Sequence, residues 1–163
     1  MFLDAIHRLY SYLSDVNKQL MAHAYEVSDE DFASVVIEGQ PSIRDTLVHM
    51  FSVIQLNTYW WGGELTGEEA FALDYRSDNY PDFDSVDNLH KKAEAEVSAF
   101  VSPLNTDGDL ERIYQRQATP DELRTKVLWE VMLHVINHGT QHRSEVAMML
   151  TKLGHSPGDM EIL

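Results

Sequence analysis

The segment Thr119–Gly154, TPDELRTKVLWEVMLHVINHGTQHRSEVAMMLTKLG, carries the clearest helix boundaries in the chain. Thr119 suits the N-cap position, Pro120 suits the first helical position, and Glu122 completes a capping box. Gly154 is the kind of residue that ends a helix. We therefore predict one long helix from Thr119 to about Leu153.

Three further amphipathic helices precede this segment. Apolar residues recur at three- and four-residue steps in the first helix, Ser42 resembles a helix start in the second, and Pro103 ends the third. The predicted ranges are residues 2–25, residues 42–61, where Gly62 and Gly63 stop the helix, and residues 85–101. Four long helices predict an all-α fold, a four-helix bundle with a long crossover connection, as a single domain over residues 1–163.

Two connections lie between these helices. Residues 64–82 form a long polar connection that contains Gly67 and Pro81. The segment LERIYQRQAT, Leu110–Thr119, alternates only weakly between polar and apolar residues, and it predicts no more than a short extended piece or a hairpin.

Composition excludes several functions. The formal charge is −15 and the sequence pI is near 4.7, so nucleic-acid binding would need a basic patch. The closest approach to one, the pair Lys91–Lys92, shares its face with two glutamates, and we expect no nucleic-acid partner. The chain has no cysteine, which excludes disulfides, thiolate metal sites and a cysteine nucleophile.

The same sequence lacks membrane and export signals. Asp4, His7 and Arg8 interrupt what would have to be the apolar centre of a signal peptide. No run approaches the roughly 18 apolar residues of a membrane span. We expect a cytoplasmic protein that does not contact a membrane.

The spacing of three histidines suggests a metal site. His138 and His142 lie one helical turn apart, with Cβ atoms roughly 5–6 Å apart, which suits two imidazoles on one ion at about 2.0–2.1 Å. His134 lies another turn back, about 12 Å from His142 along a straight helix. The three therefore cannot share one ion, and a third ligand must come from another helix.

His49 is the favoured third ligand, because its helix face carries an apolar stripe that would point into the bundle. His7 and His23 lie on more polar faces, and His90, beside two lysines, should be solvated. The alternative is that these are core histidines, since an HxxxH pair also arises by chance. Burying three adjacent imidazoles needs a partner for every ring nitrogen, which weakens that alternative. We interpret His134 as a non-ligand that packs beside the site or lines it.

These residues resemble a known family. His49 in the second helix, the segment NHGTQHR at Asn137–Arg143, and the closing LGHSPGD resemble the DinB/YfiT-like proteins, over essentially the whole chain. The resemblance implies a four-helix bundle, a divalent ion held by His49, His138 and His142, and a homodimer. It also implies a structural role for Arg143, such as pairing with a neighbouring carboxylate.

Three neutral imidazoles would leave positions open on the ion, Zn or Ni, as catalytic sites do. The ion could activate water or, as the resemblance suggests, an exogenous low-molecular-weight thiol such as bacillithiol, mycothiol or glutathione. We therefore predict a metal-dependent enzyme, S-transferase-like or hydrolase-like, with a small-molecule substrate. The alternative is a non-catalytic module in which the metal only ties helices together.

The residues around the histidines limit this chemistry. Gly-Thr-Gln separates His138 from His142, so the general-base Glu of an HExxH protease is missing. The Glu-x-x-His motifs of a di-iron bundle are missing too. Nearby carboxylates could orient ligands or act as bases, although such groups are usually only solvated or paired: Asp45, Glu130 and Glu145. Nearby aromatic residues could wall a pocket, although core packing or a dimer interface is more ordinary for at least two of them: Tyr59, Trp60 and Trp61.

Overall fold

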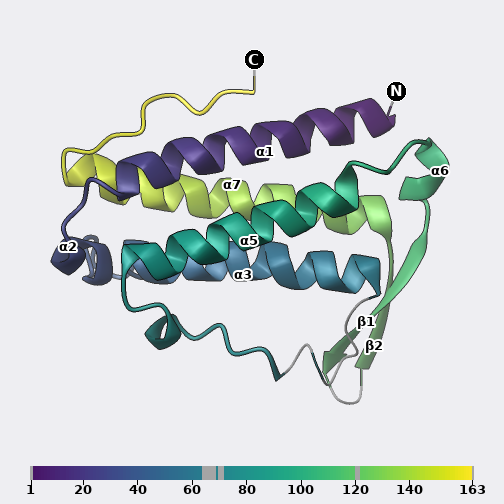
Figure 1. Cartoon of the computed structure of the whole chain (residues 1–163), viewed down its shortest axis with the longest axis horizontal. Coiled ribbons are helices and arrows are strands. Elements are labelled where there is room, and N and C mark those ends of the chain that lie inside the picture. The colour runs from purple at the N-terminus through teal and green to yellow at the C-terminus, as the bar shows by residue number, and fades with distance from the viewer. Residues whose placement is uncertain (1, 64–68, 70–71, 120–121, 163) are drawn as a thin grey trace.

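The computed structural model describes residues 2–63, 69, 72–119 and 122–162, and it confirms the predicted helical bundle (Figure 1). Its long helices are α1 (Phe2–Ala24), α3 (Ile43–Gly62), α5 (Phe83–Val101) and α7 (Leu128–Lys152). The shorter elements are α2 (Asp29–Ala33), the 3-10 helix η1 (Ser77–Asn79), α6 (Asp107–Leu110), and the strands β1 (Ile113–Thr119) and β2 (Glu122–Val127). Within the described residues, no helix is long and apolar enough to cross a membrane.

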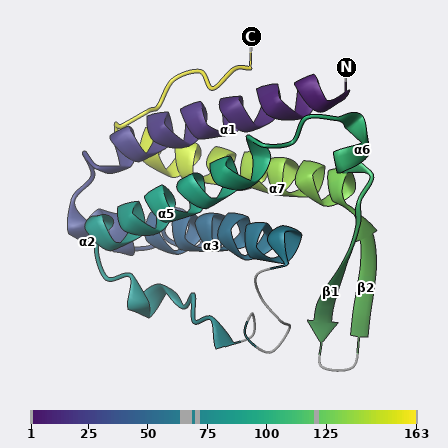
Figure 2. The ribbon, with the colours of Figure 1, turned by 45° about the vertical axis from the view of Figure 1, so that its right-hand side comes forward.

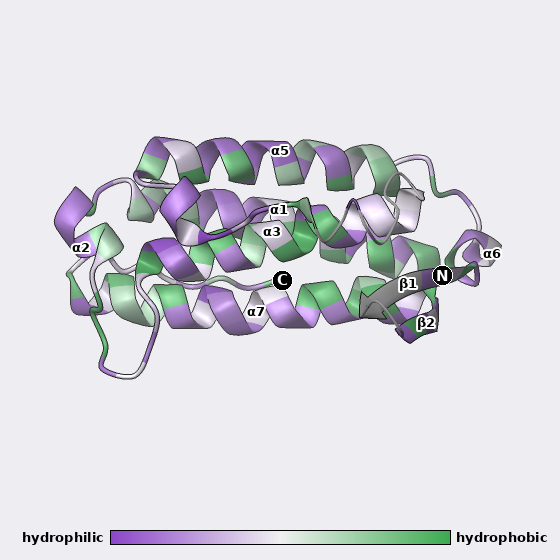
Figure 3. Ribbon diagram, turned by 90° about the horizontal axis from the view of Figure 1, so that it is seen from below, coloured by the Kyte–Doolittle hydropathy of each residue, from purple (hydrophilic) through white to green (hydrophobic). Residues whose placement is uncertain are grey.

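The order of the helices around the bundle determines which side chains can meet. Helix α3 packs against α5 and α7, and α1 packs against α7 and α5. Pairs α1–α3 and α5–α7 therefore lie on the two diagonals (Figures 1 and 2). The long segment between α3 and α5 joins two adjacent helices. The connection that contains α2 joins the diagonal pair α1 and α3, and the connection that contains β1 and β2 joins the diagonal pair α5 and α7. Apolar and polar stretches alternate along each long helix, as amphipathic helices require (Figure 3).

The predicted boundaries of α3 are confirmed, and side chains explain them. The Ser42 side chain accepts a hydrogen bond from the Asp45 backbone N–H, which satisfies one of the free donors at the start of the helix. Gly63 ends the helix in the left-handed conformation, at φ 70°. Helix α5 begins two residues earlier than predicted, because Asp82 and Ser85 form a capping box there.

The predicted start of the last helix at Thr119 is wrong, because α7 begins at Leu128. Residues 113–119 and 122–127 instead pair as two antiparallel strands, with Ile113 opposite Val127. The described residues of β2 are almost all exposed, so a helix there would have no apolar face to bury. Leu128 is the first buried residue after β2. Its N–H donates to the carbonyl of Arg112, which precedes β1. Pro120 and Asp121 of the expected cap lie outside the described residues.

The core receives side chains from all four long helices, and two residues near the end of α3 belong to it. Trp60 and Trp61 are 7% and 6% exposed. The Trp61 ring packs against Tyr10 and Phe100, with centroids 6.3 and 5.5 Å away. Tyr59 donates its hydroxyl to Glu96 at 2.5 Å. Core packing is thus the role of the two tryptophans.

The expectation that His90 is solvated is wrong, since only 4% of the residue is exposed. On a helix His90 follows buried Val86 by one turn and shares its face, while the lysines next to it in sequence turn away to solvent. The His90 ring lies against Phe51 of α3, with centroids 4.7 Å apart.

Candidate metal centre

Three imidazole rings converge between α3 and α7, the neighbouring helices that the fold brings together. The Nε2 atom of His138 lies 3.1 Å from Nε2 of His49 and 3.1 Å from Nε2 of His142. One ligand atom from each ring lies within 4.8 Å of the others, and this is the one group of potential metal ligands found among the described residues. The structure therefore brings together the three histidines that the sequence and the resemblance favoured.

Helix geometry explains the convergence. His138 and His142 are four residues apart on α7, so their rings meet edge to face on one side of the helix, with centroids 4.4 Å apart. His49 follows the Ser42 cap by two turns and stands at the border of the buried face of α3, between the buried residues Val48 and Met50. The border position leaves the His49 ring exposed on one side, so the cluster is accessible from solvent.

Desolvation favours the neutral form of two of these rings, those of His49 and His138. Desolvation, with the neighbouring His142, lowers the pKa of His49. Desolvation and the neighbouring imidazoles lower the pKa of His138 to about 4. A neutral imidazole offers a nitrogen lone pair, which a metal ion requires, whereas a protonated one does not. His49 and His138 are therefore favoured in the form that can bind a cation.

Glu145 orients one of the rings. Its Oε2 lies 2.7 Å from Nδ1 of His142. This contact favours the tautomer that donates from Nδ1 and keeps the lone pair on Nε2, which faces the cluster. Burial raises the pKa of Glu145, but hydrogen bonds from Gln141 and His142 outweigh it and hold the pKa below its usual value. Glu145 thus has the orienting role considered for it from sequence. Glu130 is exposed to solvent.

The other histidines lie elsewhere. His134 is exposed, its ring centroid is 6.0 Å from that of His138, and it is outside the group of converging ligand atoms. His155 pairs with Glu26 at 3.2 Å. The rings of His7 and His90 border a cavity between α1 and α5, on the other side of the bundle.

Arg143 has a structural role. The expectation that it pairs with a carboxylate is wrong, because its partners among the described residues are uncharged side chains. The side chain is 2% exposed, and its guanidinium donates to Asn17 Oδ1 at 3.3 Å and to Thr140 Oγ1 at 2.9 Å. It also lies over the ring of Tyr12, 5.9 Å from the centroid. The contacts with Asn17 and Tyr12 tie α7 to α1 at the residue that follows His142.

Gly139 makes room for this arginine, a role that sequence analysis did not identify. A Cβ atom at position 139 would lie 2.8 Å from Nη1 of Arg143, a distance shorter than real Cβ atoms show to their neighbours. The pattern Gly-x-x-x-Arg on one helix is the only signal that could have indicated it.

A second cavity, of about 590 Å³, opens beside His49. Its wall combines one end of α3 with the segment around η1: Arg44, Asp45, Val48, His49, Ser52, Tyr75, Arg76, Ser77 and Asp78. Tyr75 anchors that segment by donating its hydroxyl to Gln55 Oε1 at 2.7 Å. A small molecule in this cavity would lie next to His49.

The fold and the cluster define a class: helical bundles that present three convergent imidazoles at the seam between two helices. The family model described as "DinB family" matches residues 1–163, and the chain belongs to that family. The chain is 22% identical over 156 residues to Protein DinB of Bacillus subtilis (strain 168), covering 94% of this chain and 88% of that protein. A DinB-like protein of Bacillus cereus ATCC 10987, known from a crystal structure, superposes with a TM-score of 0.62 at 18% identity, over 93% of this chain and 92% of that one. This last likeness concerns the fold.

Proposed function

We propose that His49, His138 and His142 hold one divalent ion, Zn or Ni, through their Nε2 atoms, and that the protein is an enzyme that transfers an exogenous low-molecular-weight thiol to a small electrophile. The observation that carries the proposal is the convergence of three imidazoles on an accessible face, with Nε2 of His138 3.1 Å from Nε2 of His49 and 3.1 Å from Nε2 of His142. Three nitrogens bound to one ion at about 2.0–2.1 Å also lie about 3 Å apart.

The donor set fits such an ion. All three ligands are imidazoles, which suit Zn and Ni, and the chain has no cysteine that could close the coordination shell with a thiolate. When bound, the ion would supply a positive charge that lowers the pKa of a coordinated thiol or water. Three protein ligands leave room for that molecule, whereas a structural site usually has four.

The carboxylates near the cluster favour a thiol over water as the nucleophile. Glu145 is occupied by His142 and Gln141, and Asp45 accepts from Arg44 at 3.1 Å. Burial raises the pKa of Asp45, but its hydrogen bonds, first among them that of Ser42, hold it below the usual value, which makes Asp45 a weak base. A thiol, with a pKa near 8.5, needs less help to ionise than water, with a pKa of about 15.7.

The cavity beside His49 suits a thiol that carries acidic groups. Arg44 and Arg76 border it beside two carboxylates, Asp45 and Asp78, and each guanidinium has five N–H donors. Each already pairs with one carboxylate, Arg44 with Asp45 at 3.0 Å and Arg76 with Asp74 at 2.7 Å, and retains further donors. These side chains would position the carboxylates of a peptide-like thiol while its sulfur reaches His49.

Activity measurements on metal-loaded protein test the proposal. The protein is prepared without a polyhistidine tag, loaded with Zn or Ni, and assayed with glutathione or another small thiol and a chlorodinitrobenzene electrophile, beside an ester-hydrolysis panel. Turnover in the thiol assay should disappear with a chelator and in His49→Ala, and it should persist in His134→Ala. Hydrolysis without thiol transfer would make the hydrolase reading correct instead.

The non-catalytic alternative gives a different result. If the ion only ties α3 to α7, its removal lowers the melting temperature, and neither panel shows turnover above the His49→Ala background. Protein that takes up no Zn or Ni would contradict both readings.

A further inference from the structure

A cavity of about 630 Å³ lies between α1 and α5, away from the three-histidine cluster. Residues of α1 and α5 form its sides, and Phe51 and Ile54 of α3 form part of its lining. None of the three clustered histidines borders it. The volume lies in the range of about 300–1,000 Å³ that is typical of small-molecule sites.

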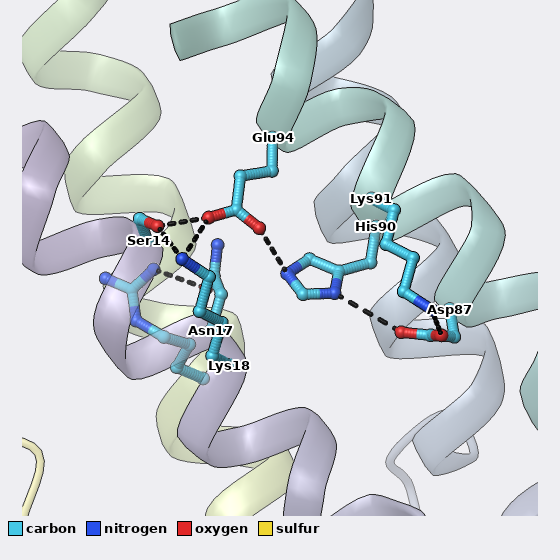
Figure 4. A network of polar contacts seen from close by, with 8 residues as sticks. Ser14, Asn17, Lys18, Asp87, His90, Lys91 and Glu94 are labelled. Carbon is cyan, nitrogen blue, oxygen red and sulfur yellow. Dashed lines mark hydrogen bonds and ion pairs between the residues drawn. The ribbon is translucent and has the colours of Figure 1, made fainter.

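His90 brings an unsatisfied polar group to this cavity. The residue is 4% exposed, and within the described chain neither of its buried ring nitrogens makes a hydrogen bond. Nδ1 lies 3.6 Å from Asp87 Oδ1, and Nε2 lies 3.6 Å from Glu94 Oε2, and both distances exceed a hydrogen bond. Figure 4 shows the ring extending from α5 toward α1, between these two carboxylates. Buried polar atoms normally have partners, so a partner is expected here.

The neutral ring determines what kind of partner fits. Burial lowers the pKa of His90, although Glu94 and Asp87 act in the opposite direction. A neutral imidazole has one N–H and one lone pair. Glu94 lines the cavity and Asp87 does not. With the proton on Nδ1, toward Asp87, the Nε2 lone pair and Glu94 Oε2 are two acceptors that face each other at the cavity wall.

Two lysines and a serine near His90 are engaged on other atoms. Lys18 of α1 pairs with Glu94 Oε1 at 2.9 Å, and Ser14 donates to the same oxygen. Lys91 pairs with Asp87 Oδ2 at 2.6 Å. From α3, the uncharged ring of Phe51 faces His90. The two facing acceptors, 3.6 Å apart, therefore suit a donor that enters from the cavity.

Part of the cavity wall is apolar. Its walls include five core residues from three helices: Tyr10, Leu13, Ile54, Val97 and Val101. Along α1 the lining runs from residue 7 to residue 18, about 16 Å at 1.5 Å per residue. At the wall two carboxylates, Asp15 and Glu94, stand against two ammonium groups, Lys18 and Lys91, and the formal charge of the chain, −15, adds a general attraction for cations.

We propose that this cavity binds a small amphipathic primary amine, whose ammonium group donates to His90 Nε2 and Glu94 Oε2 and whose apolar body lies along the walls. An ammonium group has three donors and a positive charge, which match two acceptors beside a carboxylate. An alcohol offers one uncharged donor, and a carboxylate would be repelled by Glu94.

Calorimetric titration of the full chain at pH 7 with three six-carbon probes tests the proposal. Hexylamine should bind saturably, hexan-1-ol at least about tenfold more weakly, and hexanoate should not bind. Removing a charge-assisted hydrogen bond should weaken hexylamine by about tenfold or more in Glu94→Gln and His90→Phe. Asp84→Asn removes an exposed carboxylate from the same helix outside the cavity, and it should leave the affinity unchanged.

Several results would overturn the proposal: no binding of hexylamine, equal binding of hexan-1-ol or hexanoate, or an equal loss in Asp84→Asn, which would indicate general attraction to an acidic surface. Thermal unfolding shows which variants are folded. If His90→Phe does not fold, the isosteric variant Glu94→Gln alone tests the proposal. Nitrogen NMR of the histidine rings should show the His90 proton on Nδ1 and a change at Nε2 on adding hexylamine. Protons on both nitrogens at pH 7 would remove the acceptor and contradict the proposal.

Discussion

Replacing Gly139 by Ala tests how the buried arginine fixes the helix that carries two of the three clustered histidines. In an exposed helix this substitution stabilises by about 1 kcal/mol. Here the new Cβ would lie 2.8 Å from Nη1 of Arg143, a side chain that is 2% exposed and bonded to Asn17 and Thr140. Losing one hydrogen bond to a charged group costs about 1.5–3 kcal/mol. The net effect should be a destabilisation of about 0.5–2 kcal/mol.

A double-mutant cycle isolates that contact. Urea unfolding, followed by circular dichroism, gives the free energy of unfolding for the wild type, Gly139→Ala, Arg143→Met and the double variant. Methionine lacks the guanidinium, so in its background Gly139→Ala should stabilise by about 1 kcal/mol. The sign of the effect thus reverses between the two backgrounds. If Gly139→Ala stabilises the wild type as well, the reasoning about Arg143 is refuted.

Three further predictions concern metal affinity, pH and helix capping. Glu145→Gln should weaken metal binding about 10–100-fold, because Glu145 holds the ring of His142; competition with a chelator measures this, and Glu130→Gln, exposed on the same helix, should have no effect. Burial lowers the pKa of His90, so the unfolded chain takes up this proton first as the pH falls below about 6.5, and stability is lost. The free energy of unfolding should therefore fall less between pH 7 and pH 5 in His90→Phe than in the wild type, and an equal fall would argue against a neutral ring. Ser42→Ala should lower the free energy of unfolding by about 1 kcal/mol, through loss of the cap on α3, and an unchanged urea midpoint would show that the cap does not matter.

Local signals in the sequence predicted most of the bundle. Ser42 and Gly63 bound α3 as expected, because capping depends on residues within a few positions of the helix end. The same kind of signal misled at Thr119. A good capping sequence does not make a helix unless an apolar face follows it, and residues 122–126 are exposed strand residues.

The histidines also show what local sequence signals can and cannot predict. The spacing of His138 and His142 is a property of one helix, so it could be read directly, whereas the proximity of His49 depends on which helices are neighbours in the bundle. His90 was misjudged from its sequence neighbours, although residues next to each other on a helix point about 100° apart. The partners of Arg143 could not be predicted, since Asn17 lies 126 residues away in the chain.

Elemental analysis of untagged protein shows directly whether His49, His138 and His142 bind a metal ion. The wild type and two variants, His49→Ala and His134→Ala, are incubated with Zn or Ni and freed of excess metal. We expect about one ion per chain in the wild type and in His134→Ala, whose ring lies outside the cluster, and little in His49→Ala. Retention of the ion in His49→Ala with its loss in His134→Ala, or no metal in the wild type, would contradict this expectation.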